Sequence, residues 1–146
     1  MANIVPDAFK TNLLKGVFNF DTSGNGGNTF KCALYTAITG YSTSSTVYQT
    51  GNEVSSVGTN YTTAGNTLTN NGVAIASNIA YIDFADLTFS SVTLSAVGAL
   101  IYKSGGSNEA VLVLDFGGTK TATNGDFVVQ FPTASSSAAI IRLGNA

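Results

Sequence analysis

Histidine and tryptophan are absent from this chain of 146 residues, and cysteine occurs only once, as Cys32. Without histidine, the chain lacks the commonest general base, the Ser-His-Asp and Cys-His arrangements and every histidine-containing metal site. A single cysteine allows neither an intrachain disulfide nor a cysteine-clustered zinc site. We therefore predict a non-enzymatic protein with no catalytic residues, no cofactor and no metal.

Charged residues are also scarce, at 10% of the chain against about 25% in ordinary soluble domains. The formal net charge is −2, and the six lysine and arginine residues are scattered along the sequence. Binding to nucleic acid or to an anionic membrane surface requires clustered cations, so we predict neither partner. The sequence has no signal peptide and no apolar run of about 18 residues, which predicts synthesis in a cytoplasm and no membrane-spanning segment.

One amphipathic helix is predicted near the start of the chain, over residues 6–15. Its sequence PDAFKTNLLK places Phe9, Leu13 and Leu14 on or beside one face, and Gly16 ends the pattern. These three apolar residues are our candidates for partner contact. The alternative is that they simply plug the core of the domain.

The rest of the chain, residues 17–146, is divided by glycine and asparagine into short apolar or alternating segments without helical periodicity. This predicts one all-β domain spanning 1–146, an antiparallel β-sandwich of jelly-roll type, with a partly open barrel as the alternative. Residues 40–71 are polar and are predicted to form short edge strands and long external loops. The predicted strands are 17–20, 29–37, 73–77, 80–84, 87–95, 98–104, 110–116, 126–131 and 138–143.

Two acidic pairs are candidates for chemistry. Asp83 and Asp86 are the closest carboxylates, and a carboxylate hydrolase would need both in one cleft. Residues three apart on a strand face opposite sides, so we predict Asp83 on a solvent face and Asp86 at a turn. Asp115 and Asp126 flank a glycine-rich loop, where they are predicted to cap turns, with a calcium or hydration site as the alternative.

The remaining candidates have simpler interpretations. Cys32 alternates in phase with Phe30 and Leu34, which predicts a buried, inert thiol. The six tyrosines are predicted to lie on sheet surfaces or subunit contacts, and a sugar-binding face is the alternative.

Nearly the whole chain resembles a widespread family of small tailed-bacteriophage virion proteins. The most specific marks are the run NEV at residues 52–54 and the run YTTAG at residues 61–65, in which Thr63 is an insertion relative to the family pattern. The segments FKCALYT, AYIDFADLTF and AVLVLDFGGTK occur in the same order as in the family. The resemblance implies a component of the virion and brings no catalytic residues.

By analogy with small phage β-sandwich proteins, we expect a capsid decoration (cement) protein on the exterior of the virion. Its expected partners are the major capsid protein, bound across capsomer boundaries, and itself, as a dimer or trimer. The alternative is a tail- or fibre-associated module in which the loops of residues 40–71 recognise a host surface glycan or protein.

Overall fold

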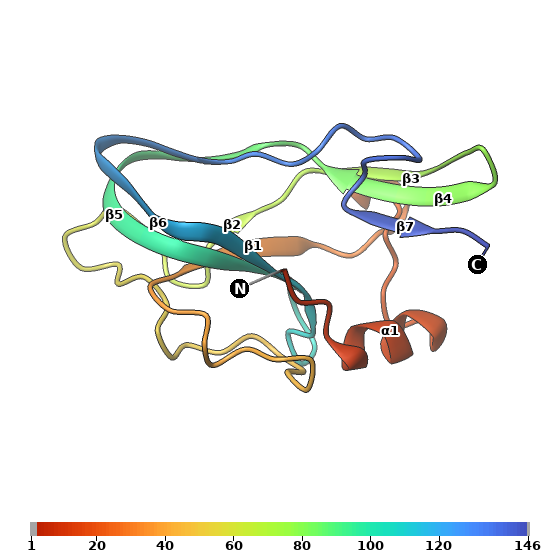
Figure 1. Ribbon diagram of the computed structural model, residues 1–146, viewed down its shortest axis with the longest axis horizontal. Coiled ribbons are helices and arrows are strands. Elements are labelled where there is room, and N and C mark those ends of the chain that lie inside the picture. The colour runs from red at the N-terminus through yellow and green to blue at the C-terminus, as the bar shows by residue number, and fades with distance from the viewer. Residues whose placement is uncertain (1–2, 146) are drawn as a thin grey trace.

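The computed structural model describes residues 3–145, and its regular secondary structure is almost entirely antiparallel β-sheet (Figure 1). One sheet has the strand order β2-β1-β5-β6 and the other the order β3-β4-β7. The predicted all-β fold with one short helix is confirmed, whereas the jelly-roll order stays a prediction. The elements are α1 (Asp7–Leu14), a 3₁₀ turn (Ser23–Asn25), β1 (Phe30–Tyr35), β2 (Asn66–Thr67), β3 (Asn70–Ala76), β4 (Ile79–Phe84), β5 (Leu87–Lys103), β6 (Ala110–Val129) and β7 (Ile141–Leu143).

Helix α1 forms where the sequence predicts it. Pro6, with its fixed φ, precedes the first turn, and Gly16 follows the last turn with φ +73°, a conformation that favours glycine. No helix among residues 3–145 is long and apolar enough to cross a membrane. The segment 17–20, predicted as a strand, lies outside the strands of the described residues, although it keeps the predicted alternation, with Phe18 and Phe20 buried and Asn19 exposed between them.

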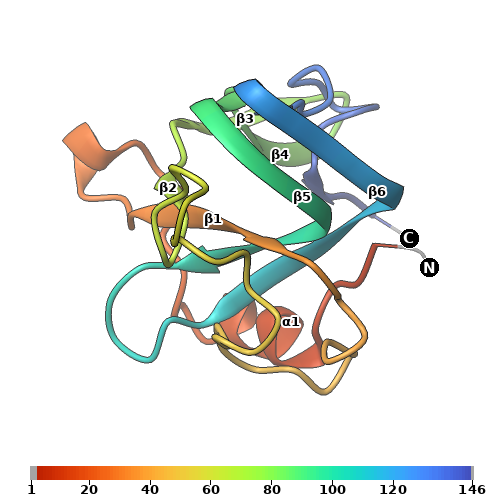
Figure 2. The same ribbon diagram turned by 90° about the vertical axis from the view of Figure 1, so that its left-hand side faces the viewer.

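Strands β5 and β6 are much longer than predicted, since each joins two of the predicted strands. They pair along their length and curve together round one end of the molecule (Figures 1 and 2). The predicted glycine-rich loop between Asp115 and Asp126 is therefore wrong, and its residues lie inside β6. Ala96 of β5 pairs with Lys120 of β6, but Gly98 pairs with Asp115. The register therefore shifts between these two pairs, and β6 forms a bulge between Asp115 and Lys120. Such a bulge bends a strand without ending it.

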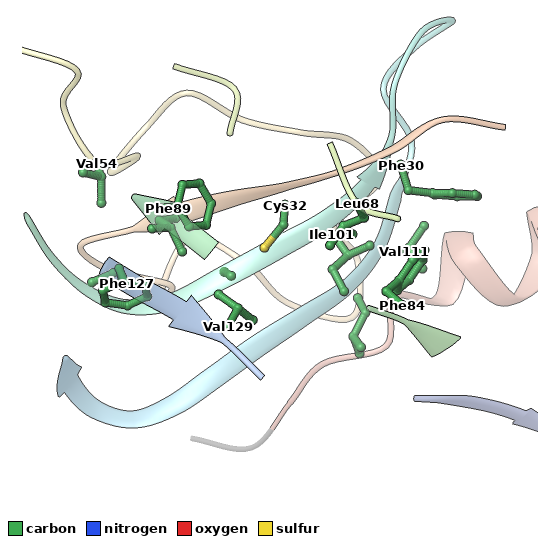
Figure 3. Close-up of a cluster of buried hydrophobic side chains, with 14 of the residues drawn as sticks. Phe30, Cys32, Val54, Leu68, Phe84, Phe89, Ile101, Val111, Phe127 and Val129 are labelled. Atoms are coloured by element: carbon green, nitrogen blue, oxygen red, sulfur yellow. The ribbon is translucent and has the colours of Figure 1, made fainter. Parts of the chain in front are cut away.

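Strand β1 is buried on both faces. Phe30, Cys32 and Leu34 belong to the core between the sheets, as Figure 3 shows for the first two. Ala33 and Tyr35, on the other face, belong to a second apolar cluster that the loop of residues 36–65 covers. The predicted buried thiol is confirmed, since Cys32 is fully buried and burial raises its pKa to about 12.

The prediction that the tyrosines lie on the surface is wrong for most of them. Tyr35, Tyr41, Tyr61 and Tyr102 are each at most 5% exposed. A buried hydroxyl is tolerated only with hydrogen-bond partners, and each of these has one. The Tyr35 hydroxyl donates to the Gln49 carbonyl, and that of Tyr102 donates to a carbonyl of the same long loop.

Glu53 is the centre of this polar network. Its Oε1 accepts hydrogen bonds from the Tyr61 hydroxyl (2.8 Å) and the Ala64 N–H (2.7 Å), and its Oε2 accepts one from the Tyr48 hydroxyl. The Tyr61 oxygen accepts the N–H of Leu34 in β1 at 3.0 Å. These bonds fasten the long loop to the central strand. The runs NEV (52–54) and YTTAG (61–65) therefore meet in space and have a structural role in this chain.

Candidate protein-binding surface

The three residues predicted to contact a partner lie in different environments. Phe9 is 4% exposed and packs against Phe18, with ring centroids 5.1 Å apart, so it contributes to the core. Leu13 is half-buried at the edge of that core. Leu14 is 90% exposed at the end of α1. Of the predicted set, Leu13 and Leu14 remain accessible to a partner.

The small sheet adds apolar residues next to the end of α1. Its register places Val73, Ile75 and Leu143 on one face, because Val73 is opposite Ile82, and Ile75 and Leu143 are both opposite Ala80. These three side chains are 58%, 74% and 56% exposed. The sheet extends beyond the part of the molecule that packs on the core, as Figure 1 shows for the β3–β4 hairpin.

An apolar groove of about 310 Å³ lies between the end of α1 and this face of the small sheet. A second cleft of about 630 Å³ continues from it, between α1 and β7, and includes Leu14. We call the two together the apolar groove. The residues that line the first part are Leu13, Phe18, Asn19, Phe20, Val73, Ala80, Tyr81, Ile82, Ile141 and Leu143.

The two cations that line the apolar groove, Lys10 and Arg142, are engaged within the chain. The Lys10 ammonium lies 2.8 Å from Asp7 in an exposed ion pair on α1. The Arg142 guanidinium donates to the carbonyls of Ser136 and Ser137. Exposed aliphatic side chains gathered on adjacent elements favour a protein partner that covers them, because burial of apolar surface is the main driving force of association.

The predicted position of Asp83 is wrong, since this side chain is 1% exposed. Its Oδ1 accepts the Phe84 N–H at 2.8 Å. Burial raises the pKa of the Asp83 carboxyl, and backbone N–H groups of Phe84 and Ile140 oppose that rise. Asp86 is exposed, and its Oδ1 accepts the Phe131 N–H at 2.8 Å. Both carboxylates therefore hold neighbouring backbone rather than open into a common cleft.

The second acidic pair also accepts backbone N–H groups, Asp115 locally and Asp126 across the sheet. The Oδ1 of Asp115 accepts the Gly117 N–H at 2.8 Å, and the Oδ1 of Asp126 accepts the Ser91 N–H at 3.1 Å. Within residues 3–145, no three histidine, cysteine, aspartate or glutamate side chains lie close enough together to hold a metal ion.

Sequence reasoning missed the exposed face of the small sheet. The run VAIAS at residues 73–77 predicts a strand, but it carries no polar alternation that would indicate an exposed face. Its exposure depends on what packs against it, and a sequence does not contain that information.

Comparison of the chain with protein-family models, with curated proteins and with solved structures found no match.

Proposed function

We propose that this chain is a non-enzymatic structural protein of a bacteriophage particle. In this proposal it is a decoration protein that binds the major capsid protein on the exterior of the shell, across capsomer boundaries, and stabilises it. A ligand that binds only the assembled lattice favours that lattice by mass action. The class of particle rests on the resemblance of the sequence, and the binding role rests on the structure.

The observation that carries the binding role is the apolar groove with its exposed aliphatic rim. Leu14 and Val73, which line the two parts of the groove, are 90% and 58% exposed. Burying an aliphatic side chain of this size contributes about 1.5–3 kcal/mol. Such groups remain in water only at a cost to solubility, so a partner that covers them is the simplest account of their position.

The alternative, a tail module that recognises a host through the loops of residues 40–71, has less support. Of the three tyrosines in those loops, Tyr41 and Tyr61 are buried, and Tyr48 is half-buried with its ring stacked on Tyr102. The loops use their hydroxyl and carbonyl groups to bind the central sheet. We therefore place the contact with the particle at the apolar groove.

A binding experiment with particles that lack the chain tests this assignment. Recombinant chain is added, and the amount that sediments with the particles is measured for the wild type and for Leu14→Asp. We expect saturable binding of the wild type and at least about tenfold weaker binding of Leu14→Asp, because a carboxylate cannot be buried in an apolar contact. Leu14 is too exposed for its replacement to disturb the core.

The matched control is Val57→Asp, since Val57 is 85% exposed and the loop that carries it, yellow in Figure 1, lies at the other end of the molecule. This variant should bind as the wild type does. Failure of the wild-type chain to sediment with the particles would overturn the proposed function. Equal binding by Leu14→Asp would move the contact away from the groove.

A further inference from the structure

Strand β3 has a free edge. It is the outer strand of the sheet β3-β4-β7, and its first residues are covered, since the Asn70 side chain donates to the carbonyls of Phe20 and Asp21. From Val73 to Ala76, however, the described chain places no strand beside it, and all four residues are exposed. This segment therefore presents unpaired backbone N–H and C=O groups to a partner.

The β3–β4 hairpin is regular up to its tip. Ala76 pairs with Ile79, and the two residues between them, Ser77 and Asn78, have φ values of +52° and +62°. Positive φ at both positions is the signature of a type I′ turn, whose twist matches that of the flanking strands. The free edge is consequently held in the extended conformation that strand pairing requires.

The other sheet edges carry features that discourage pairing, and β3 does not. Strand β2 has two residues, β7 has three and includes Arg142, and β6 carries Lys120 and is paired at Val113 with Ile4. Short length, charge and a covering segment are the usual protections of an edge strand. The segment from Val73 to Ala76 has no charge and no proline.

Charge indicates what pairs with this edge. No aspartate, glutamate, lysine or arginine occurs between Glu53 and Asp83, so the hairpin offers nothing to attract a charged strand. A second copy of the same segment brings no charge that would be repelled. Antiparallel pairing about a two-fold axis also brings the exposed Val73 and Ile75 side chains of both copies together on one face.

We propose that the segment from Val73 to Ala76 pairs antiparallel with the same segment of a second copy. The two small sheets then form one six-stranded sheet, and their apolar grooves join across the two-fold axis. This inference goes beyond the proposed function and stands without it. Four residues on each side bury less than the roughly 800 Å² per partner of a standard interface, so the dimer is weak in dilute solution. Attachment of many copies to one surface raises its occupancy.

Sedimentation velocity over a concentration series up to about 1 mM tests the dimer. We expect reversible dimerisation of the wild type and at least a tenfold higher dissociation constant for Ala74→Lys. Ala74 pairs with Tyr81 and lies on the opposite face from the apolar groove, so the variant places like charges across the edge and leaves the groove intact. Val57→Lys adds the same charge elsewhere and should dimerise as the wild type does.

Cysteine crosslinking locates the contact. Single cysteines at positions 73 to 76 are oxidised in turn, and the native thiol does not compete because it is buried. Cα atoms of directly opposed residues in an antiparallel pair lie about 4.5–5.5 Å apart, within the range of a disulfide. We expect one position or two adjacent ones to form covalent dimers, and Val57→Cys to form none.

A chain that remains monomeric at every concentration, with no position crosslinking above the Val57→Cys control, would overturn the inference. Crosslinking of these positions to a different protein in purified particles would do the same, because the edge would then have another occupant. Either result leaves the proposed function untouched, since a monomer can still occupy the shell.

Discussion

Replacing Gly65 with alanine is expected to lower the free energy of unfolding by about 2–5 kcal/mol, a large part of the roughly 5–15 kcal/mol available to a domain. Gly65 has φ +72°, and a Cβ there would lie 1.9 Å from the carbonyl oxygen of Cys32 in β1. Neither atom can move freely, because the carbonyl oxygen belongs to the backbone of β1 and the Cβ is bonded directly to the backbone of residue 65. Chemical denaturation measures the effect as a lower midpoint with little change in slope.

Gly58→Ala is the matched control. Gly58 has φ +73°, nearly that of Gly65, but among the described residues no heavy atom lies within 4 Å of the added Cβ. This variant should lose only the cost of the left-handed conformation, about 1–2 kcal/mol. Equal losses at the two positions would contradict the close packing of the long loop on β1.

Glu53→Ala should destabilise the protein by about 3–5 kcal/mol, since hydrogen bonds to a charged group contribute about 1.5–3 kcal/mol each. The substitution removes the acceptor for the Tyr61 hydroxyl and the Ala64 N–H, both of which it leaves inside the structure. It also releases the Tyr48 hydroxyl. Thermal unfolding should show a lower Tm, and protease cleavage should begin within residues 36–65.

Glu53→Gln separates the hydrogen bonds from the volume of the side chain. Its Oε1 can still accept the Tyr61 hydroxyl and the Ala64 N–H, while its amide replaces only the oxygen that faces Tyr48. We expect it to recover more than half of the stability lost in Glu53→Ala. A Glu53→Ala variant as stable as the wild type would show that the network does not hold the loop.

The sequence was a good guide to individual strands where side-chain alternation decides the structure. The pattern of Phe30, Cys32 and Leu34 correctly indicated both β1 and its buried thiol. It did not indicate that Ala33 and Tyr35 are equally buried. That outcome depends on the loop of residues 36–65, which covers the other face of β1 through hydrogen bonds between residues distant in sequence.

Local turn propensity was misleading in β6 and at Asp83. Gly117 and Gly118 favour a turn, but cross-strand pairing with β5 absorbs them as a bulge. Asp83 was expected on a solvent face because residues three apart on a strand, here Asp83 and Asp86, face opposite sides. The Phe84 N–H that Asp83 Oδ1 accepts is a backbone group, which every residue except proline has, and so no sequence signal identifies it.

The candidate surface was predicted only in part. The helical spacing correctly directed attention to the end of α1, yet it did not distinguish Phe9, which packs inward, from the accessible Leu14. The contribution of Val73 and Ile75 depends on a sheet that extends past the core. That extension is a property of the tertiary arrangement, and the apolar run alone does not indicate it.

The copy number of this chain in purified particles is the most direct test of the proposed function. Quantitative mass spectrometry would compare it with the major capsid protein of the same particles. A decoration protein that covers the shell should be present at a ratio close to one, or close to one third if it binds as one copy per symmetric group of three subunits. A ratio below about one in twenty would contradict shell-wide decoration, since only a vertex or tail assembly has so few sites. Absence of the chain from particles would contradict the virion assignment altogether.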